Sequence, residues 1–274
     1  MVEAIVHELQ IRQSLVGGQD VQTIYFGGGT PSVLSADQLE KILNAVYKNY
    51  SATASPEVTL EANPDDINAD FLLQLNALSI NRLSIGIQSF NNNVLKYFNR
   101  VHDAAQAKSS ILLAREVGFR NINADLIYAL PEMNGYSFEE DLEQMLALKP
   151  EHISAYTLTI EPKTVFGSRY KKGLLKTLDE DTAAEQFSLL SEHLQNAGYE
   201  HYEISNFCKP GFHSRHNSSY WEGEKYVGVG PGAHGFDGKQ RYANVSNNAI
   251  YIKKVLGGED DYYTAETLSA TDRA

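Results

Sequence analysis

The sequence predicts an α/β protein built around a parallel sheet or barrel. Strand-like runs of five to nine residues alternate with helical patterns five times along the chain, which is typical of consecutive βαβ units. The 274 residues, 42% of them hydrophobic and 21% charged, are enough to bury the core of one barrel-sized domain or of two smaller domains.

The first half of the chain supplies four of the expected strands. Apolar residues at helical spacing predict a helix over residues 2–13, and a β-rich run follows at 21–26. Ser35 and Gln38 form a capping-box pattern, which predicts a helix that begins at Ser35. The other elements expected here are strands at 57–61, 82–88 and 121–128, a helix at 69–78 and a helix pair within 92–117.

The second half starts with the same alternation and then changes character after Gly198. Ser137 and Glu140 form a second capping-box pattern and predict a helix that ends near residue 148. The segments that follow are a β-rich run at 152–160, a helix at 182–197, an edge-strand-like run at 199–211 and a loop-like run at 213–236.

This change of pattern predicts a domain boundary near residue 200. We expect a barrel domain over residues 1–200 and a small accessory region over residues 201–274.

Composition limits the partners of the chain. The net charge of −12 and the pI near 5.1 would repel a nucleic-acid backbone, so nucleic acid is not an expected partner. No apolar run approaches the roughly 18 residues that a membrane span needs, and the amino terminus lacks the apolar core of a signal peptide. We therefore expect a cytoplasmic protein. The single cysteine, Cys208, can build neither a disulfide nor a multi-thiolate metal site and is interpreted as a structural thiol.

Three consecutive glycines end the first expected strand, in the stretch YFGGGTPS. Glycines let the backbone approach a ligand closely and present bare N–H and C=O groups, which suits a zwitterion or a phosphate. No Lys-Ser or Lys-Thr follows, so the stretch is not a P-loop. The alternative is a tight turn without a ligand.

Polar residues stand at the carboxyl ends of the next three strands. Glu61, Gln88 and Asp125 occupy equivalent places there, and ligands of parallel α/β folds bind at that edge of the sheet. We expect these side chains to converge on one pocket that accepts hydrogen bonds from an ammonium group or a ribose diol. A carboxylate that only caps a helix is the alternative for each position.

The stretch HNSSYW carries the other candidate site. It places His216 and Asn217 beside Tyr220 and Trp221, the only tryptophan. A histidine among flat aromatic rings could hold a planar ligand or a haem iron, and a loop anchored by its aromatic residues is the alternative. The later GPGAHG matches a dinucleotide fingerprint in form, but it contains proline and no helix follows, so it is interpreted as a turn.

Five stretches together resemble one family over about residues 1–255. They are YFGGGTPS, LEANPDDI, RLSIGIQSFNNNVLKYFNRVH, ADLIYALP and YEISNFCKPGFHSRHNSSYWEGEKYVGVGPGAHG. The chain resembles the oxygen-independent coproporphyrinogen III oxidase-like branch of the radical S-adenosylmethionine (SAM) superfamily. Its HNSSYW stretch is similar to that of the haem chaperones in this branch, and the coproporphyrinogen dehydrogenase lacks it.

The resemblance implies a partial (β/α)6 barrel that holds SAM and a [4Fe-4S] cluster. It implies that the glycine motif receives the methionine moiety of SAM through backbone groups, and that polar residues of later strands contact the rest of the cofactor. No catalytic residue is assigned. The SAM-binding positions that the resemblance implies are Gly28, Gly29, Thr30, Glu61, Gln88, Arg100 and Asp125, with Thr159 aligned less securely.

The resemblance also implies a function in haem metabolism. The first expectation is a chaperone that binds haem or a porphyrin and passes haem to an acceptor protein, at the periphery of membrane respiratory proteins. His216 is then a haem ligand, with Asn217, Tyr220 and Trp221 around it. The alternatives are a coproporphyrinogen III dehydrogenase that oxidises propionates with a 5′-deoxyadenosyl radical, and a barrel enzyme that has lost its cluster.

The chain departs from the family pattern in three places. It has neither the first strand nor the CxxxCxxC motif that binds the cluster, and it stops before a helical carboxyl-terminal domain. We therefore expect a truncated form, with the [4Fe-4S] cluster only in the full-length protein. The third departure is Ala129, where the family usually has glycine.

Overall fold

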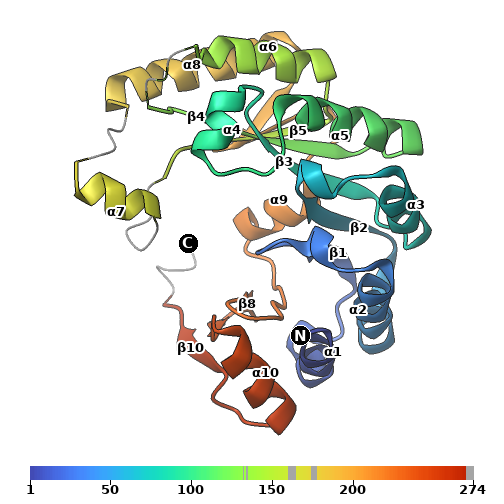
Figure 1. Cartoon of the computed structure of the whole chain (residues 1–274). Coiled ribbons are helices and arrows are strands. Elements are labelled where there is room, and N and C mark those ends of the chain that lie inside the picture. Colours follow the sequence, from blue (N-terminus) through green and yellow to red (C-terminus); the bar gives the residue numbers. More distant parts are fainter. Residues whose placement is uncertain (132, 134, 160–164, 174–177, 270–274) are drawn as a thin grey trace. The chain divides into compact units, whose positions relative to one another are not determined.

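The computed structural model describes residues 1–131, 133, 135–159, 165–173 and 178–269 (Figure 1). The chain divides into two compact units, which are described separately below. Unit 1 comprises residues 1–59, 77–79 and 214–274, and unit 2 comprises residues 60–76 and 80–213. These limits differ from the predicted boundary near residue 200, and the division into 1–200 and 201–274 stays a prediction.

A sheet of seven strands has the order β1-β2-β3-β4-β5-β7-β6. The β3–β4 and β4–β5 pairs are parallel, whereas β7 runs antiparallel to both β5 and β6. Helices connect the successive strands from β1 to β5, so the predicted α/β fold with a partial (β/α) barrel is confirmed. The strands are β1 (Val21–Phe26), β2 (Ala52–Ala62), β3 (Arg82–Gln88), β4 (Ile122–Tyr128), β5 (His152–Thr157), β6 (Glu200–Glu203) and β7 (Asn206–Cys208).

Unit 1 contains β1, most of β2 and a small antiparallel sheet of order β10-β9-β8. Helix α1 packs against both α2 and α10. The predicted capping box of α2 is present, because Ser35 and Gln38 exchange side-chain and backbone hydrogen bonds. The remaining elements of unit 1 are α1 (Val2–Ile11), α2 (Ala36–Asn49), α9 (Arg215–Trp221), β8 (His234–Phe236), β9 (Gln240–Asn244), α10 (Asn248–Gly257) and β10 (Tyr263–Thr267).

A buried carboxylate holds the carboxyl-terminal part of unit 1 to α1. Glu8 is fully buried and accepts hydrogen bonds from Arg12 Nε (2.6 Å), the Gly230 N–H (2.9 Å), Asn244 Nδ2 (2.8 Å) and the Tyr251 hydroxyl (2.6 Å). Four donors compensate the cost of removing the charge from water. The glycine-rich stretch that contains Gly230 is therefore a structural turn, as the sequence predicts.

Unit 2 is the parallel part of the fold with its helices. All residues of β3 except Gln88 are buried, as is usual for a parallel strand with both faces covered. Helices α6 and α8 pack against each other, and α8 contacts β4 (Figure 1). The helices of unit 2 are α3 (Ala69–Ala77), α4 (Asn92–Tyr97), α5 (Ala104–Val117), α6 (Phe138–Leu148), α7 (Val165–Lys171) and α8 (Glu180–Asn196).

Three expectations of local structure need correction. Residues 213–236 are not all loop, because α9 forms within them after Ser214, whose side chain accepts a hydrogen bond from the Asn217 N–H. The second predicted capping box is only half formed: Ser137 accepts from the Glu140 N–H, but its hydroxyl donates to Glu139. The predicted strand at 152–160 ends at Thr157, and residue 160 lies outside the described residues.

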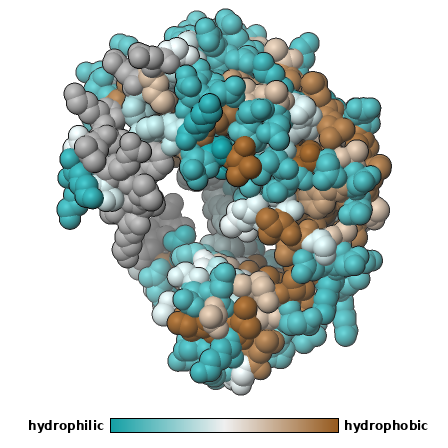
Figure 2. All heavy atoms as spheres, viewed as in Figure 1, coloured by the Kyte–Doolittle hydropathy of each residue, from teal (hydrophilic) through white to brown (hydrophobic). Residues whose placement is uncertain are grey.

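Hydrophilic residues cover most of the face in Figure 2, with hydrophobic residues scattered among them. Within the described ranges, none of the helices has the length and hydrophobicity of a membrane-spanning segment.

Candidate functional site

Two acidic side chains predicted to converge do approach each other in unit 2. Glu61 lies near the end of β2 and Asp125 lies in β4. The pKa of Asp125 is raised to about 6, mainly by burial and also by the negative charge of Glu61, against the opposing effect of a hydrogen bond from Asn123 Nδ2 (2.7 Å). A carboxyl group with this pKa can exchange a proton near neutral pH and can accept hydrogen bonds from a polar ligand.

Arg100 belongs to the same cluster and is not an ordinary surface residue. Its Nη2 donates to Asn63 Oδ1 (2.7 Å) and to the carbonyl oxygen of Gly86 (3.0 Å). Burial lowers the pKa of Arg100, whereas the charges of Asp65 and Asp125 raise it. The guanidinium therefore places a positive charge near the acidic groups of Asp65 and Asp125.

The backbone of β3 turns sharply where Gln88 ends the strand. Gln88 has a φ of 68°, and the pairing of β3 with β4 shifts register between Ile85 and Gln88. Left-handed backbone is unfavourable for a residue with a side chain and often marks a functional position. A Cβ on Gly86 would lie 3.1 Å from Arg100 Nη2 and 3.2 Å from Gln88 Nε2, so glycine leaves these two polar side chains room beside the strand.

His102 supports this cluster from the buried side. It is 2% exposed, its Nε2 lies 3.1 Å from the carbonyl oxygen of Ile87, and its Nδ1 lies 3.6 Å from Asp65 Oδ1. Burial lowers the pKa of His102, which favours the neutral ring. The sequence alone gave His102 no role, and the structure places it behind the end of β3.

A chain of buried hydrogen bonds fixes Asp125 from the other side. The Asn123 side chain donates to Ser84 Oγ (2.8 Å) as well as to Asp125, and its Oδ1 lies 2.6 Å from His152 Nδ1 and 3.0 Å from Ser154 Oγ. Asn123, Asn63 and Gly86 were not predicted as site residues. Asn63 belongs to the stretch LEANPDDI, directly after an expected strand, and this position could have predicted it as a site residue.

The predicted glycine motif lies in unit 1, in the turn after β1. Gly28 and Gly29 have φ values of 81° and 86°, and a Cβ at either would meet no atom within 4 Å. Both glycines are exposed, and Thr30 precedes the short 3-10 helix Pro31–Val33. The positive φ angles explain the glycines.

Thr159 lies beyond the end of β5 and is exposed. The neighbouring Leu158 N–H donates to the carbonyl oxygen of Tyr128 (3.2 Å), which keeps this segment beside β4. Ala129, where the resemblance leads us to expect glycine, follows β4 with a φ of 56°. A left-handed residue explains a glycine preference at this position.

His216 lies in α9 of unit 1 with both ring nitrogens in contact with hydroxyl groups. Nδ1 lies 3.0 Å from Thr23 Oγ1, and Nε2 lies 3.0 Å from the Tyr220 hydroxyl. The imidazole also stacks on Tyr25, with ring centroids 4.6 Å apart. Either neutral tautomer satisfies both contacts, because each hydroxyl can donate or accept; in the tautomer with a proton on Nδ1, Nδ1–H donates to Thr23 and the Tyr220 hydroxyl donates to Nε2.

A carboxylate from β2 fixes the start of α9. Glu57 is 4% exposed, and its two carboxylate oxygens accept the backbone N–H groups of Arg215 and His216, both at 3.2 Å. A negative charge at a helix amino terminus satisfies unpaired N–H groups and interacts favourably with the helix dipole. This residue, which the sequence did not single out, sets the position of His216.

Tyr220, which contacts His216, and the neighbouring Trp221 both reach the surface. The exposed fractions of Tyr220 and Trp221 are 48% and 64%. Asn217 lies in the same helix, with its backbone N–H bonded to Ser214 Oγ (3.2 Å). His216, Asn217, Tyr220 and Trp221 thus lie on one short helix of unit 1, which the sequence did not predict, and their role as a planar-ligand site stays a prediction.

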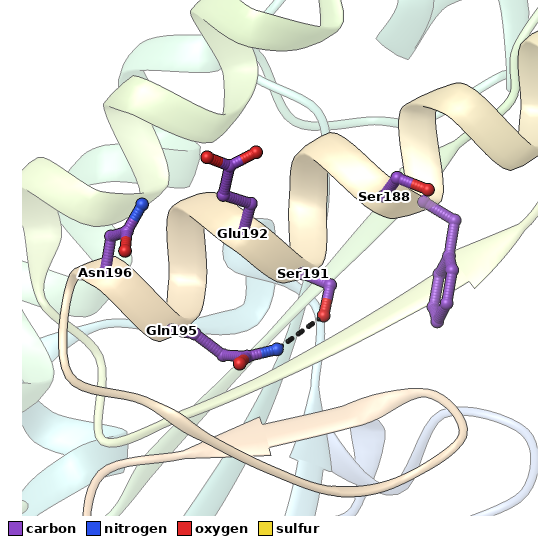
Figure 3. Close-up of a pocket in the computed structure, with 6 residues that line it drawn as sticks. Ser188, Ser191, Glu192, Gln195 and Asn196 are labelled. Atoms are coloured by element: carbon purple, nitrogen blue, oxygen red, sulfur yellow. Dashed lines mark hydrogen bonds between the residues drawn. The ribbon is translucent and has the colours of Figure 1, made fainter.

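A separate pocket of about 400 Å³ lies along α8 in unit 2 (Figure 3). Gln195 Nε2 donates to Ser191 Oγ (2.7 Å) there. None of the predicted site residues lines this pocket, whose residues are Phe187, Ser188, Ser191, Glu192, Gln195 and Asn196.

Comparison with known proteins gives the class of this protein. Residues 3–145 match the family model of the Radical SAM superfamily, which is more than half of the chain. The chain belongs to the radical SAM superfamily. Membership implies SAM and a [4Fe-4S] cluster as the cofactors of the family.

Among curated proteins the chain is similar to Heme chaperone HemW from several bacteria. It is 40% identical to that of Lactococcus lactis over 92% of this chain and 65% of the relative. The Bacillus subtilis protein is 38% identical over 92% of this chain and 66% of the relative. The chain thus spans slightly less than two thirds of the length of these relatives.

Among solved structures the chain is similar to coproporphyrinogen III oxidase (HemN) from Escherichia coli. The TM-score is 0.82 at 26% identity, covering 98% of this chain and 65% of that one. Elp3 from Methanocaldococcus infernus, at 20% identity and a TM-score of 0.52, shares the fold. The predicted resemblance to the coproporphyrinogen III oxidase-like branch and to its haem chaperones is confirmed.

The residues present fit one of the two family cofactors. Glu61, Gln88, Arg100 and Asp125 offer acceptors and a cation of the kind that ribose hydroxyls, an ammonium and a carboxylate require. The single cysteine of the sequence cannot supply the three thiolates of a [4Fe-4S] site. No chemical step is therefore assigned through a cluster in this chain.

Proposed function

We propose that this protein is a haem chaperone, which binds haem and transfers it to an acceptor protein. The similarity to Heme chaperone HemW over 92% of the chain carries the proposal, and the geometry around His216 supports it. A cytoplasmic location and an acceptor among membrane respiratory proteins are further parts of the proposal.

His216 Nε2 is the nitrogen that would bind the haem iron. Histidines that bind metals usually donate their second ring N–H to an acceptor, which fixes the tautomer and the ring orientation. Thr23 Oγ1 fills that place at Nδ1. The Tyr220 hydroxyl occupies Nε2, and its side chain is half exposed and can move aside for iron.

The cluster in unit 2 would bind SAM in the same proposal. Arg100 would face the carboxylate of SAM, whereas Glu61 and Asp125 would accept from its ammonium or ribose hydroxyls. The turn at Gly28, Gly29 and Thr30 would present backbone groups to the methionine moiety, and Thr159 a backbone contact to adenine. SAM bound there would gate haem binding.

The similarity to coproporphyrinogen III oxidase at a TM-score of 0.82 supports a second candidate, an oxidase that acts on coproporphyrinogen III. Anaerobic equilibrium titrations of the chain with haem and with coproporphyrinogen III would distinguish the two. We expect one haem per chain, with a shifted Soret band, and weaker binding of coproporphyrinogen III. Tight binding of coproporphyrinogen III without haem binding would overturn the chaperone proposal.

A further inference from the structure

The edge of the large sheet in unit 2 carries three different metal-binding side chains in one place. Glu200 of β6 and Cys208 of β7 are directly paired across the two antiparallel strands. His213, five residues beyond the end of β7, returns to the same place, with Nε2 3.1 Å from Glu200 Oε2. One ligand atom from each of the three residues lies within 4.8 Å of the other two.

We propose that Glu200, Cys208 and His213 bind one divalent transition-metal ion, with zinc as the best match. Zinc is bound by thiolate, imidazole and carboxylate groups at about 2.0–2.3 Å, usually in tetrahedral geometry. Ligand atoms at such distances from one ion stand roughly 3–4 Å apart; here His213 Nε2 and Glu200 Oε2 are 3.1 Å apart, and no two of the three ligand atoms are more than 4.8 Å apart. The mixed sulfur, nitrogen and oxygen set favours zinc over magnesium or calcium.

The surrounding structure already holds two of these ligands in place. Cys208 is fully buried and pairs with His152 of β5 as well as with Glu200, so its backbone is fixed on both sides. The His213 ring packs edge-on against Tyr202 at 4.8 Å, and the Tyr202 hydroxyl lies 2.7 Å from His152 Nε2. Such supporting contacts orient metal ligands in known sites.

The site has three protein ligands and one open side. The side chains of Glu200 and His213 are 48% and 42% exposed, so the fourth position of a tetrahedral ion faces solvent. This is the arrangement of zinc sites that bind water or a small ligand in the fourth position. The alternative is a surface ion pair between His213 and Glu200 above a thiol with no metal.

A metal–sulfur bond separates these two explanations. Zinc and similar ions bind cysteine as the thiolate, so an occupied site contains a bond to Cys208 Sγ that a surface ion pair lacks.

Titration of the metal-free chain with Co²⁺ alone tests the proposal directly. Cys208 is the only cysteine, so a near-ultraviolet thiolate-to-cobalt charge-transfer band can come from no other residue. We expect this band at one Co²⁺ per chain, and its disappearance when Zn²⁺ is added. Absence of the band at saturating Co²⁺ would overturn the proposal.

Two variants test Cys208 and His213 as ligands, and a third variant is the control. Cys208→Ser should abolish the band, and His213→Gln should weaken Zn²⁺ binding by about tenfold or more. His201→Gln is the matched control. His201 follows Glu200 in β6, but its ring stacks on Phe207 and is not one of the three proposed ligands. His213 is at the surface, so its variant remains informative even if Cys208→Ser fails to fold. Equal Zn²⁺ affinity of His213→Gln and His201→Gln would contradict the assignment.

Discussion

The Tyr220 hydroxyl lies 3.0 Å from Nε2 of His216, on the ring nitrogen that Thr23 leaves available. Burial raises the pKa of Tyr220, so the hydroxyl keeps its proton, and it donates that proton to Nε2 in the tautomer that carries its hydrogen on Nδ1. Iron and Tyr220 would therefore compete for the same lone pair.

Replacement of Tyr220 by phenylalanine should remove this competition. A hydrogen bond of this kind contributes about 0.5–1.5 kcal/mol, so Tyr220→Phe should bind haem about twofold to tenfold more tightly. The aromatic ring remains, and any stacking on the porphyrin is retained. Titration followed at the Soret band measures the affinity. A clear loss of affinity in Tyr220→Phe would show that the hydroxyl itself helps to bind haem.

Gly86→Ala tests the SAM proposal for unit 2. The new methyl group would lie 3.1 Å from Arg100 Nη2 and 3.2 Å from Gln88 Nε2, closer than ordinary contacts. We expect SAM affinity to fall by about tenfold, because displacement of a charged hydrogen bond costs about 1.5 kcal/mol or more. Isothermal titration calorimetry with SAM measures this change.

Gly257→Ala is the control for that experiment. Its methyl group would make only contacts of 3.6 and 3.9 Å with Glu259, at the end of α10. It should leave SAM affinity unchanged. If both glycine variants bind SAM as the unsubstituted chain does, the cluster around Gly86 is not the SAM site.

Asp125→Asn should change how stability depends on pH. The pKa of Asp125 is raised from 3.8 to about 6 in the folded state, so its ionisation opposes folding as the pH rises through this range. The variant lacks this cost. Its free energy of unfolding relative to the unsubstituted chain should increase by up to about 3 kcal/mol between about pH 4 and pH 7. Burial likewise raises the pKa of Asp141 to about 6, but both proteins contain that group.

Urea denaturation at a series of pH values measures this difference. Parallel stability profiles for Asp125→Asn and the unsubstituted chain would mean that Asp125 ionises as easily in the folded protein as in the unfolded one.

Glu8→Gln should be among the more destabilising single-atom changes in unit 1. An NH₂ group would replace one of two oxygens that together accept four hydrogen bonds and pair with Arg12. Breaking a buried charge pair costs about 3–5 kcal/mol. Lys41→Gln, which removes an exposed pair with Glu3, should cost less than about 1 kcal/mol. Similar urea midpoints for these two variants would contradict the role given to Glu8.

The fold was predictable because hydrophobic periodicity and capping residues are local signals. The predicted range of β3 at 82–88 and the start of α2 after Ser35 agree with the structure. Helix α9 was missed because Ser and Asn are weak helix formers, and its amino terminus depends on Glu57, which is far away in the sequence.

Glu61 and Gln88 lie at the ends of β2 and β3, where the sequence predicts polar residues, whereas Asp125 lies in the middle of β4 and not at its carboxyl end as predicted. The roles of Gly86, Asn63 and Asn123 depend on contacts between strands, which no local pattern contains. The contact between Thr23 and Nδ1 of His216 could not be predicted from the sequence either, because Thr23 lies in β1, far from His216 along the chain.

The most direct test of the chaperone proposal is the haem affinity of His216→Ala beside that of His234→Ala. His234 is exposed at the start of β8 and is a histidine outside the His216 cluster. We expect His216→Ala to lose the shifted Soret band and to bind haem about tenfold more weakly or worse, and His234→Ala to behave as the unsubstituted chain does. An unchanged Soret band and affinity in His216→Ala would contradict the chaperone proposal.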